Sequence, residues 1–138
     1  TFRAWQRLRF STVELASDSV SGPAADPDQD GLPNLAEYAF GSEPKNRNAS
    51  SIRIRAAASP GGRLTLEYDR LSTLGDVEFI WETSSDLRTW AAATLESPSV
   101  TPLPDQLRET MIATVAGDSS APRFYRLRVE LRSSTSAI

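Results

Sequence analysis

Residues 26–37 read DPDQDGLPNLAE, and the rest of the chain is organised around this stretch. It matches D-x-[DN]-x-[DN]-G-x₅-E, the pattern of a calcium-binding loop, at every defined position. Calcium takes roughly six to eight oxygen ligands, and a loop of this length can supply most of them. Gly31 stands at the sharp turn, where the backbone adopts a conformation that residues with a Cβ resist. The stretch therefore predicts one bound Ca²⁺ ion.

Six residues receive a ligand role from their place in the loop. The predicted metal ligands are Asp26, Asp28, Asp30, the backbone carbonyl of Leu32, Asn34 and Glu37. Glu37 would bind through both carboxylate oxygens, and Asn34 would bind directly or through a water molecule. The alternative interpretation is a solvated acidic turn before a helix, which has no need for glycine and glutamate at these positions.

The flanks of the loop differ from a paired EF-hand. Residues 21–23 (Ser-Gly-Pro) interrupt any helix that would run into position one. Pro33 stands at position eight, which is usually an apolar residue that pairs two hands. The loop is therefore similar to the solitary calcium loops of dockerins and thrombospondin type 3 repeats. We expect a structural ion rather than a regulatory switch.

The amino-acid composition argues against several classes of partner and site. The chain has 138 residues with a net charge of −3, so nucleic acid is a poor candidate partner. It has no cysteine and no histidine, which excludes disulfides, the usual zinc sites and catalysis by imidazole. No apolar run approaches the roughly twenty residues that a membrane helix needs, so we expect no membrane insertion.

The first 45 residues are expected to form a cap of short helices. Residues 2–16 read as two helices, with Ser11 and Glu14 at capping-box spacing and Trp5, Phe10 and Leu15 as buried residues. Residues 17–25 read as a polar turn. A further helix begins near Pro33 and ends at Gly41.

Residues 46–138 are expected to form the β-sandwich. Residues 45–51 read as a polar connector, and from residue 52 the sequence changes to the alternating pattern of strands. The predicted strands lie near residues 52–56, 64–68, 77–81, 90–95, 107–115 and 125–131. Residues 60–62 read as a turn, and residues 97–104, with three prolines, read as a loop. The pattern predicts a mainly β fold: an antiparallel β-sandwich or open barrel with an N-terminal cap of short helices. Trp81 is expected in its core.

The order of motifs resembles a C-terminal module of secreted and surface proteins from Verrucomicrobia, Planctomycetes and related bacteria. The resemblance rests on FRAW (2–5), FS (10–11), ADPDQDGLPNLAEYAFG (25–41), DV (76–77), WETSSDLRTW (81–90) and FYRLRV (124–129). It implies an extracellular or cell-surface location and a calcium-loaded module, and it implies no catalytic activity. Gln29 replaces a glycine common in the family, at a position expected to point outward.

Three functions stay open from the sequence. The first is a non-catalytic, calcium-stabilised accessory module that mediates attachment or protein–protein association, with its parent polypeptide or itself as partner. The second is a carbohydrate-binding module of a secreted enzyme or adhesin, with Trp90 or Phe124 as an exposed platform for a glycan. The third is an enzyme using carboxylate pairs such as Glu67 with Asp69 or Glu78 with Glu82.

The arginines of the predicted strands also have two interpretations. They are Arg53, Arg55, Arg126 and Arg128. They either form a basic stripe for an acidic partner or pair with glutamates across a sheet.

Overall fold

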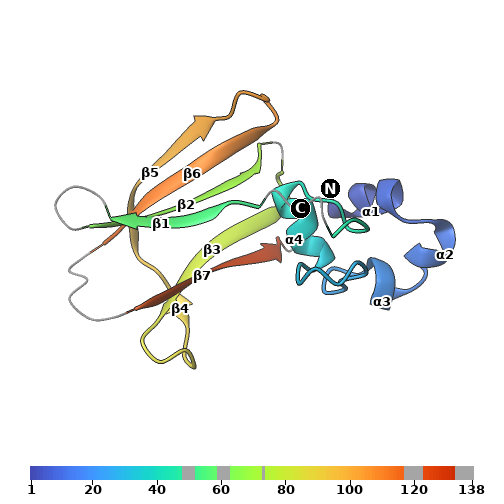
Figure 1. Ribbon diagram of the computed structural model, residues 1–138, viewed down its shortest axis with the longest axis horizontal. Helices are drawn as coiled ribbons and strands as arrows, with labels where there is room; N and C mark the ends of the chain where they lie inside the picture. The colour runs from blue at the N-terminus through green and yellow to red at the C-terminus, as the bar shows by residue number, and fades with distance from the viewer. Residues whose placement is uncertain (48–51, 59–62, 73, 117–122, 133–138) are drawn as a thin grey trace, which may run out of the picture. The chain divides into compact units, whose positions relative to one another are not determined.

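The computed structural model describes residues 1–47, 52–58, 63–72, 74–116 and 123–132. The described part of the chain is mainly β, with 40% of its residues in strands and 20% in helices. The helices in the described residues are α1 (Phe2–Arg9), α2 (Thr12–Leu15), α3 (Asp18–Ser21) and α4 (Asn34–Phe40) (Figure 1). The strands are β1 (Ile54–Ala58), β2 (Leu64–Leu71), β3 (Val77–Ser84), β4 (Ala91–Ala92), β5 (Leu95–Pro102), β6 (Arg108–Val115) and β7 (Phe124–Leu131).

The chain divides into two compact units. The first, here called the helical unit, comprises Thr1–Ile52, Thr73–Glu78 and Val129–Ile138. The second, here called the strand unit, comprises Arg53–Ser72 and Phe79–Arg128. Segments from the middle and from the end of the chain thus join the N-terminal helices in one unit.

Local capping explains where the helices begin and end. Thr1 accepts a hydrogen bond from the backbone N–H of Ala4, and Ser11 and Glu14 form the predicted capping box at the start of α2. These bonds satisfy backbone N–H groups that have no partner within a helix. Gly41 ends α4 at φ 79°, in the left-handed conformation that glycine adopts without strain.

An aromatic cluster forms the core of the helical unit. Phe2 lies 5.5 Å from Trp5 and 5.4 Å from Tyr38 between ring centroids, and Trp5 also contacts Phe10 at 6.0 Å. Phe2, Phe10 and Tyr38 are buried and Trp5 is half-buried. Because α1 and α2 are too short to be stable alone, this packing supplies their stability. Leu8 of α1 is 84% exposed and takes no part in the cluster.

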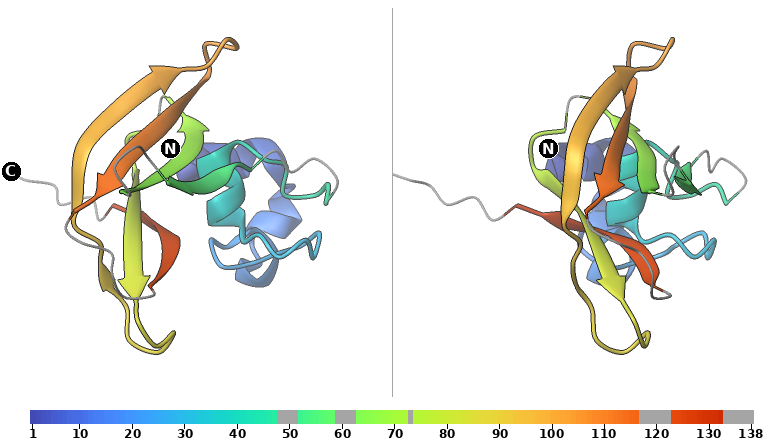
Figure 2. Two further views of the ribbon diagram at one scale, coloured as in Figure 1. Left: turned by 60° about the vertical axis from the view of Figure 1, so that its left-hand side comes forward. Right: turned by 90° about the vertical axis from the view of Figure 1, so that its left-hand side faces the viewer.

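The strand unit contains two antiparallel sheets packed on each other, as predicted for a β-sandwich (Figure 2). One sheet has the order β1-β2-β6-β5 and the other β4-β3-β7. Tyr68 of β2 stacks on Phe79 of β3 at 4.9 Å and meets Trp81 edge-on at 6.1 Å. Trp81 is 8% exposed, which confirms its predicted place in the core.

Three local predictions were wrong. Most of residues 97–104 belong to β5 rather than a loop, because β5 is an edge strand and Pro98 lies in a register shift between Glu96 and Ser99. Proline is tolerated at sheet edges and bulges. The strand predicted from Trp90 to Leu95 is reduced to the two residues of β4, and residues 17–25, predicted as turn, contain α3. The turn predicted at residues 60–62 and part of the 45–51 connector lie outside the described residues.

Candidate functional site

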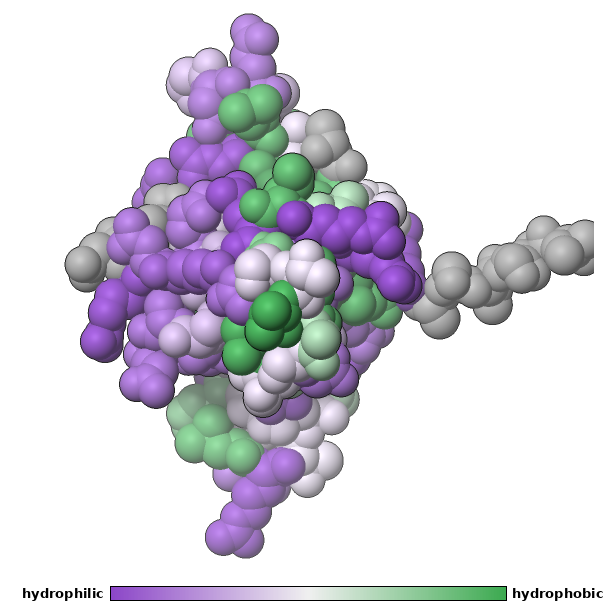
Figure 3. All heavy atoms as spheres, turned by 90° about the vertical axis from the view of Figure 1, so that its right-hand side faces the viewer, coloured by the Kyte–Doolittle hydropathy of each residue, from purple (hydrophilic) through white to green (hydrophobic). Residues whose placement is uncertain are grey.

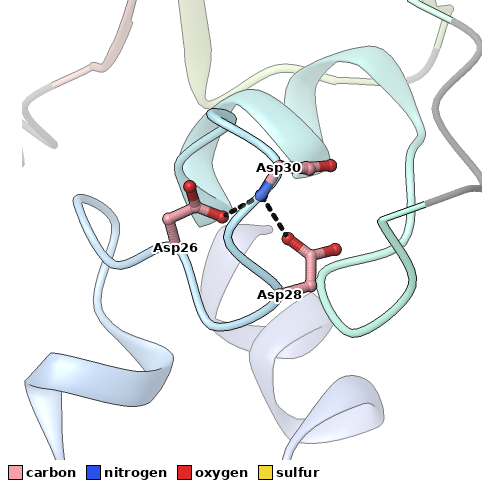
Figure 4. Close-up of side chains that lie close together, drawn as sticks. All are labelled: Asp26, Asp28 and Asp30. Carbon is pink, nitrogen blue, oxygen red and sulfur yellow. Dashed lines mark hydrogen bonds between the residues drawn. The ribbon is translucent and has the colours of Figure 1, made fainter.

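The acidic loop is closed by its own carboxylates (Figure 4). Asp26 accepts hydrogen bonds from the backbone N–H groups of Asp30, at 3.3 Å, and Gly31, at 2.9 Å. Asp28 accepts from Asp30 N at 3.4 Å, and Asp30 accepts from Leu32 N at 2.9 Å. One oxygen from each of the three aspartates lies within 4.8 Å of the others. Such a group of carboxylates repels itself unless a cation or protons neutralise it.

Backbone conformation at two positions lets the loop turn this tightly. Gly31 has φ 91° and Gln29 has φ 58°. Positive φ costs glycine little and other residues more, so Gln29 carries strain that a glycine there would not. The Gln29 side chain is exposed, as predicted.

Asn34, in the C-terminal half of the loop, is hydrogen-bonded to residues that precede the loop. Its Nδ2 donates to the carbonyls of Val20, at 2.8 Å, and Gly22, at 2.9 Å, and its backbone N–H donates to Ala25 O at 2.8 Å. The residue is fully buried, yet its Oδ1 has no hydrogen-bond partner. The Asn34 amide nitrogen therefore stabilises the local fold, and the amide oxygen is left as an acceptor without a partner.

Glu37 is the most unusual group of this region. It is 0% exposed, and neither of its carboxylate oxygens has a hydrogen-bond partner. Its pKa is raised to about 7, first by burial and then by the charges of Asp30 and Asp28, against a lowering contribution from the Ser42 hydroxyl. A buried carboxylate without partners is strongly unfavourable, so this position requires either a proton or a cation.

Free oxygens recur in the other predicted ligands. Oδ2 of Asp28 and Oδ2 of Asp30 are also buried without a hydrogen-bond partner. Burial and the neighbouring Asp26 and Asp30 carboxylates raise the pKa of Asp28. An aspartate triad with unpaired oxygens could hold a metal ion, and the donor set of oxygens alone suits a hard cation.

The structure treats the six predicted ligands unequally. It brings Asp26, Asp28 and Asp30 together, whereas Glu37 lies outside that group and is linked to it by the charges that raise its pKa. Leu32 is half-buried and donates its N–H to Asp30.

Asp76 is an organising residue that the sequence did not single out as a site. Its Oδ2 accepts from Phe2 N at 2.7 Å, its Oδ1 accepts from the Tyr38 hydroxyl at 2.6 Å, and its carbonyl accepts from Arg132 N at 2.8 Å. Burial acts to raise the pKa of Asp76, but the Tyr38 and Phe2 hydrogen bonds hold it below its usual value. The only local signal is a Gly-Asp turn, since the partners are far apart in sequence.

The carboxylates that were candidate acid–base groups make ordinary contacts between strands. Glu67 pairs with Arg55 of the neighbouring strand. Glu82 is 8% exposed and accepts from Arg126 at 2.8 Å, with Arg128 at 3.3 Å. Guanidinium groups neutralise both glutamates, and the pKa of Glu82 is lowered mainly by its hydrogen bond with Arg126. Arg55, Arg126 and Arg128 therefore pair with glutamates of a neighbouring strand in the same sheet, which is the second interpretation of the strand arginines.

The other two members of the carboxylate pairs lie in different settings. Asp69 is 9% exposed and accepts from the Thr110 hydroxyl at 2.6 Å, while Glu78 is exposed on β3.

Trp90 and Phe124, the two candidate platforms for a glycan, differ in how much of each ring is accessible. The Arg126 guanidinium lies 4.2 Å from the ring centroid of Trp90, so one face of that indole is covered. Phe124 is 43% exposed. Of the two rings, Phe124 is thus the more accessible.

None of the helices in the described part of the chain has the length and apolar character needed to cross a bilayer. No family model, curated protein or solved structure matches this chain.

Proposed function

We propose that residues 26–37 bind one calcium ion and that the protein is a calcium-stabilised, non-catalytic extracellular module. The observation that carries the proposal is the fully buried Glu37 carboxylate, whose two oxygens lack partners beside an aspartate triad. When bound, the ion would supply the positive charge that these four carboxylates lack. Asp26, Asp28, Asp30 and Glu37 would hold it, together with the Leu32 carbonyl and Asn34.

Calcium is favoured over magnesium by the nature of the donors. The residues are oxygen ligands on an irregular loop, and calcium tolerates flexible geometry with roughly six to eight ligands. Magnesium demands near-octahedral coordination and keeps much of its water. The sequence pattern, complete from Asp26 to Glu37, is also that of a calcium loop.

The role proposed for the ion is structural, because α4 carries both a ligand and core residues. Glu37 is followed by Tyr38, which packs on Phe2 and donates to Asp76. Neutralising Glu37 by a cation removes the cost of its burial and so stabilises the whole helical unit. At a calcium concentration one hundred times the dissociation constant, linkage gives about 2.7 kcal/mol.

The proposed module holds or assembles rather than catalyses. Glu67 and Glu82 are committed to ion pairs with arginines, which supports a structural role for both. The resemblance to secreted and surface modules supports an extracellular setting and association with the parent polypeptide or another copy.

Exposed apolar side chains of the helical unit are candidates for such association. The surface seen in Figure 3 is largely hydrophilic, with hydrophobic side chains in small separate patches. Leu8 and Val13 are 84% and 81% exposed.

Calorimetric titration of chelator-treated protein with CaCl₂ tests the proposal. We expect one site with a dissociation constant of roughly 10⁻⁴–10⁻³ M or tighter, and weaker binding of MgCl₂. Glu37→Gln keeps the shape and removes the charge, and it should lower the affinity at least tenfold. Asp18→Asn, on an exposed aspartate of α3, is the matched control and should change nothing. No binding at 10 mM calcium, or equal binding by the Glu37→Gln variant, would falsify the proposal.

A further inference from the structure

A polar cavity lies in the strand unit, in residues unrelated to the acidic loop. Its volume is about 210 Å³. Its polar side chains come from β3 (Thr83), β7 (Tyr125), the residue before β7 (Arg123) and the β4–β5 connection (Thr94). Alanine and valine residues of β4, the connection after it and the end of β6 complete the lining. Thr94 is held in place because its carbonyl accepts from Ala116 N at 2.9 Å.

One polar group of this cavity is buried without a hydrogen-bond partner, and two others have no partner among the described residues. Thr83 Oγ1 is buried and has no hydrogen-bond partner. Among the described residues, no hydrogen bond or ion pair engages the Arg123 guanidinium or the Tyr125 hydroxyl. Arg126 of the same strand differs, since Glu82 neutralises it. The buried Thr83 hydroxyl without a partner lies beside an exposed arginine without a counter-ion among the described residues. Together they fit a ligand that carries both hydroxyls and an anionic group.

We propose that this cavity binds one uronate residue of an acidic saccharide. The guanidinium of Arg123 matches a carboxylate through two parallel hydrogen bonds. Hydroxyls of Thr83, Thr94 and Tyr125 can each donate and accept, as sugar hydroxyls require. The apolar face of a sugar ring can pack on the Tyr125 ring.

Size and charge narrow the ligand class. The cavity is smaller than the roughly 300–1,000 Å³ of sites that enclose drug-sized molecules, so it suits a single monosaccharide unit. One arginine balances the single charge of a carboxylate, whereas a phosphate monoester carries about −1.5 to −2 near neutral pH. The inference is independent of the calcium proposal, because no predicted metal ligand lines this cavity.

Nuclear magnetic resonance titration of the ¹⁵N-labelled full chain tests it, at saturating calcium. The probes are trimers of galacturonate, glucuronate and mannuronate, with the methyl ester of each trimer as the uncharged control. We expect at least one acid trimer to shift the amide signals of Thr83, Thr94 and Tyr125. The methyl esters should bind at least tenfold more weakly.

Two variants and a control locate the binding. Arg123→Gln should lower the affinity at least tenfold, and Thr83→Val, which removes only the hydroxyl, about threefold or more. Arg88→Gln, at an exposed arginine elsewhere in the strand unit, should leave the affinity unchanged.

Three outcomes would overturn the inference. They are the absence of binding by all three acid trimers, equal affinity of the Arg123→Gln variant, and tighter binding of an acetylated dipeptide carboxylate than of any uronate. The acid trimers should still bind the Glu37→Gln variant, so failure of the calcium proposal would not be mistaken for failure here.

Discussion

Replacing Asp76 by asparagine should destabilise the helical unit. The expected effect is larger than is usual for a residue in a short connection between strands. Each carboxylate oxygen accepts one short hydrogen bond, from the Tyr38 hydroxyl at 2.6 Å and from Phe2 N at 2.7 Å. Asparagine keeps one acceptor and turns an NH₂ group toward a donor. Hydrogen bonds to charged groups contribute about 1.5–3 kcal/mol each. Losing one and weakening the other should lower the free energy of unfolding by about 2–4 kcal/mol.

A double-mutant cycle with Tyr38→Phe isolates the contact. Removing the hydroxyl alone should cost about 1–2 kcal/mol, and the double variant should cost at least about 1 kcal/mol less than the sum. Urea denaturation measures the free energies of unfolding of the single and double variants. Hydrogen exchange at amides of α1 and α4 then reports the local stability of the two helices. Glu78→Gln, two residues along the chain at an exposed site, is the control and should stay within about 0.5 kcal/mol. Additive effects of Asp76→Asn and Tyr38→Phe would refute the reasoning.

The same carboxylate sets an acid limit. Because the pKa of Asp76 is lowered in the folded protein, folding favours its ionised form. That stabilisation is present above the unfolded-state pKa, about 4, and is lost as pH falls through the folded-state value. Asp76→Asn should remove this part of the acid sensitivity.

Three further predictions concern the acidic loop. In chelator-treated protein, the pKa of Glu37 is raised to about 7 by burial, so folding favours its protonated form. Stability should therefore fall by about 1–3 kcal/mol between pH 4.5 and 7, an effect absent from Glu37→Gln and from thermal melts in calcium. Gly31→Ala meets no heavy atom within 4 Å, so its expected cost of about 1–2 kcal/mol comes from φ 91° alone and is measured by the melting temperature. Gln29→Gly relieves strain at φ 58° but increases the conformational entropy of the unfolded chain. The free energy of unfolding of this variant should therefore stay within about 0.5 kcal/mol of the parent protein's. A stabilisation of 2 kcal/mol at Gln29 would contradict this balance.

Local signals predicted the parts of the fold that depend on nearby residues. The capping box of Ser11 and Glu14 and the stop at Gly41 each depend on contacts within a few residues, and the structure has both. The final strand alternates half-buried Tyr125 and Leu127 with exposed Arg126, as its two-residue period predicts. The grouping of the three loop aspartates follows from their spacing alone.

Features that depend on tertiary context escaped prediction. Pro98 reads locally as a strand breaker, and only the edge position of β5 makes it acceptable. All of β1 is exposed although Ile54 and Ala56 alternate with arginines, because an edge strand need not bury either face. Asp76 joins Phe2 and Tyr38 across 74 and 38 positions of sequence, a distance over which no local pattern extends.

The positions of the tryptophans give each unit its own optical reporter. Trp5 lies in the aromatic cluster of the helical unit, whereas Trp81 and Trp90 belong to the strand unit. A protein with phenylalanine at positions 81 and 90 would show tryptophan emission only from the helical unit, and Trp5→Phe would show it only from the strand unit. Parallel calcium titrations of the two variants would then separate events at the acidic loop from events in the sheets.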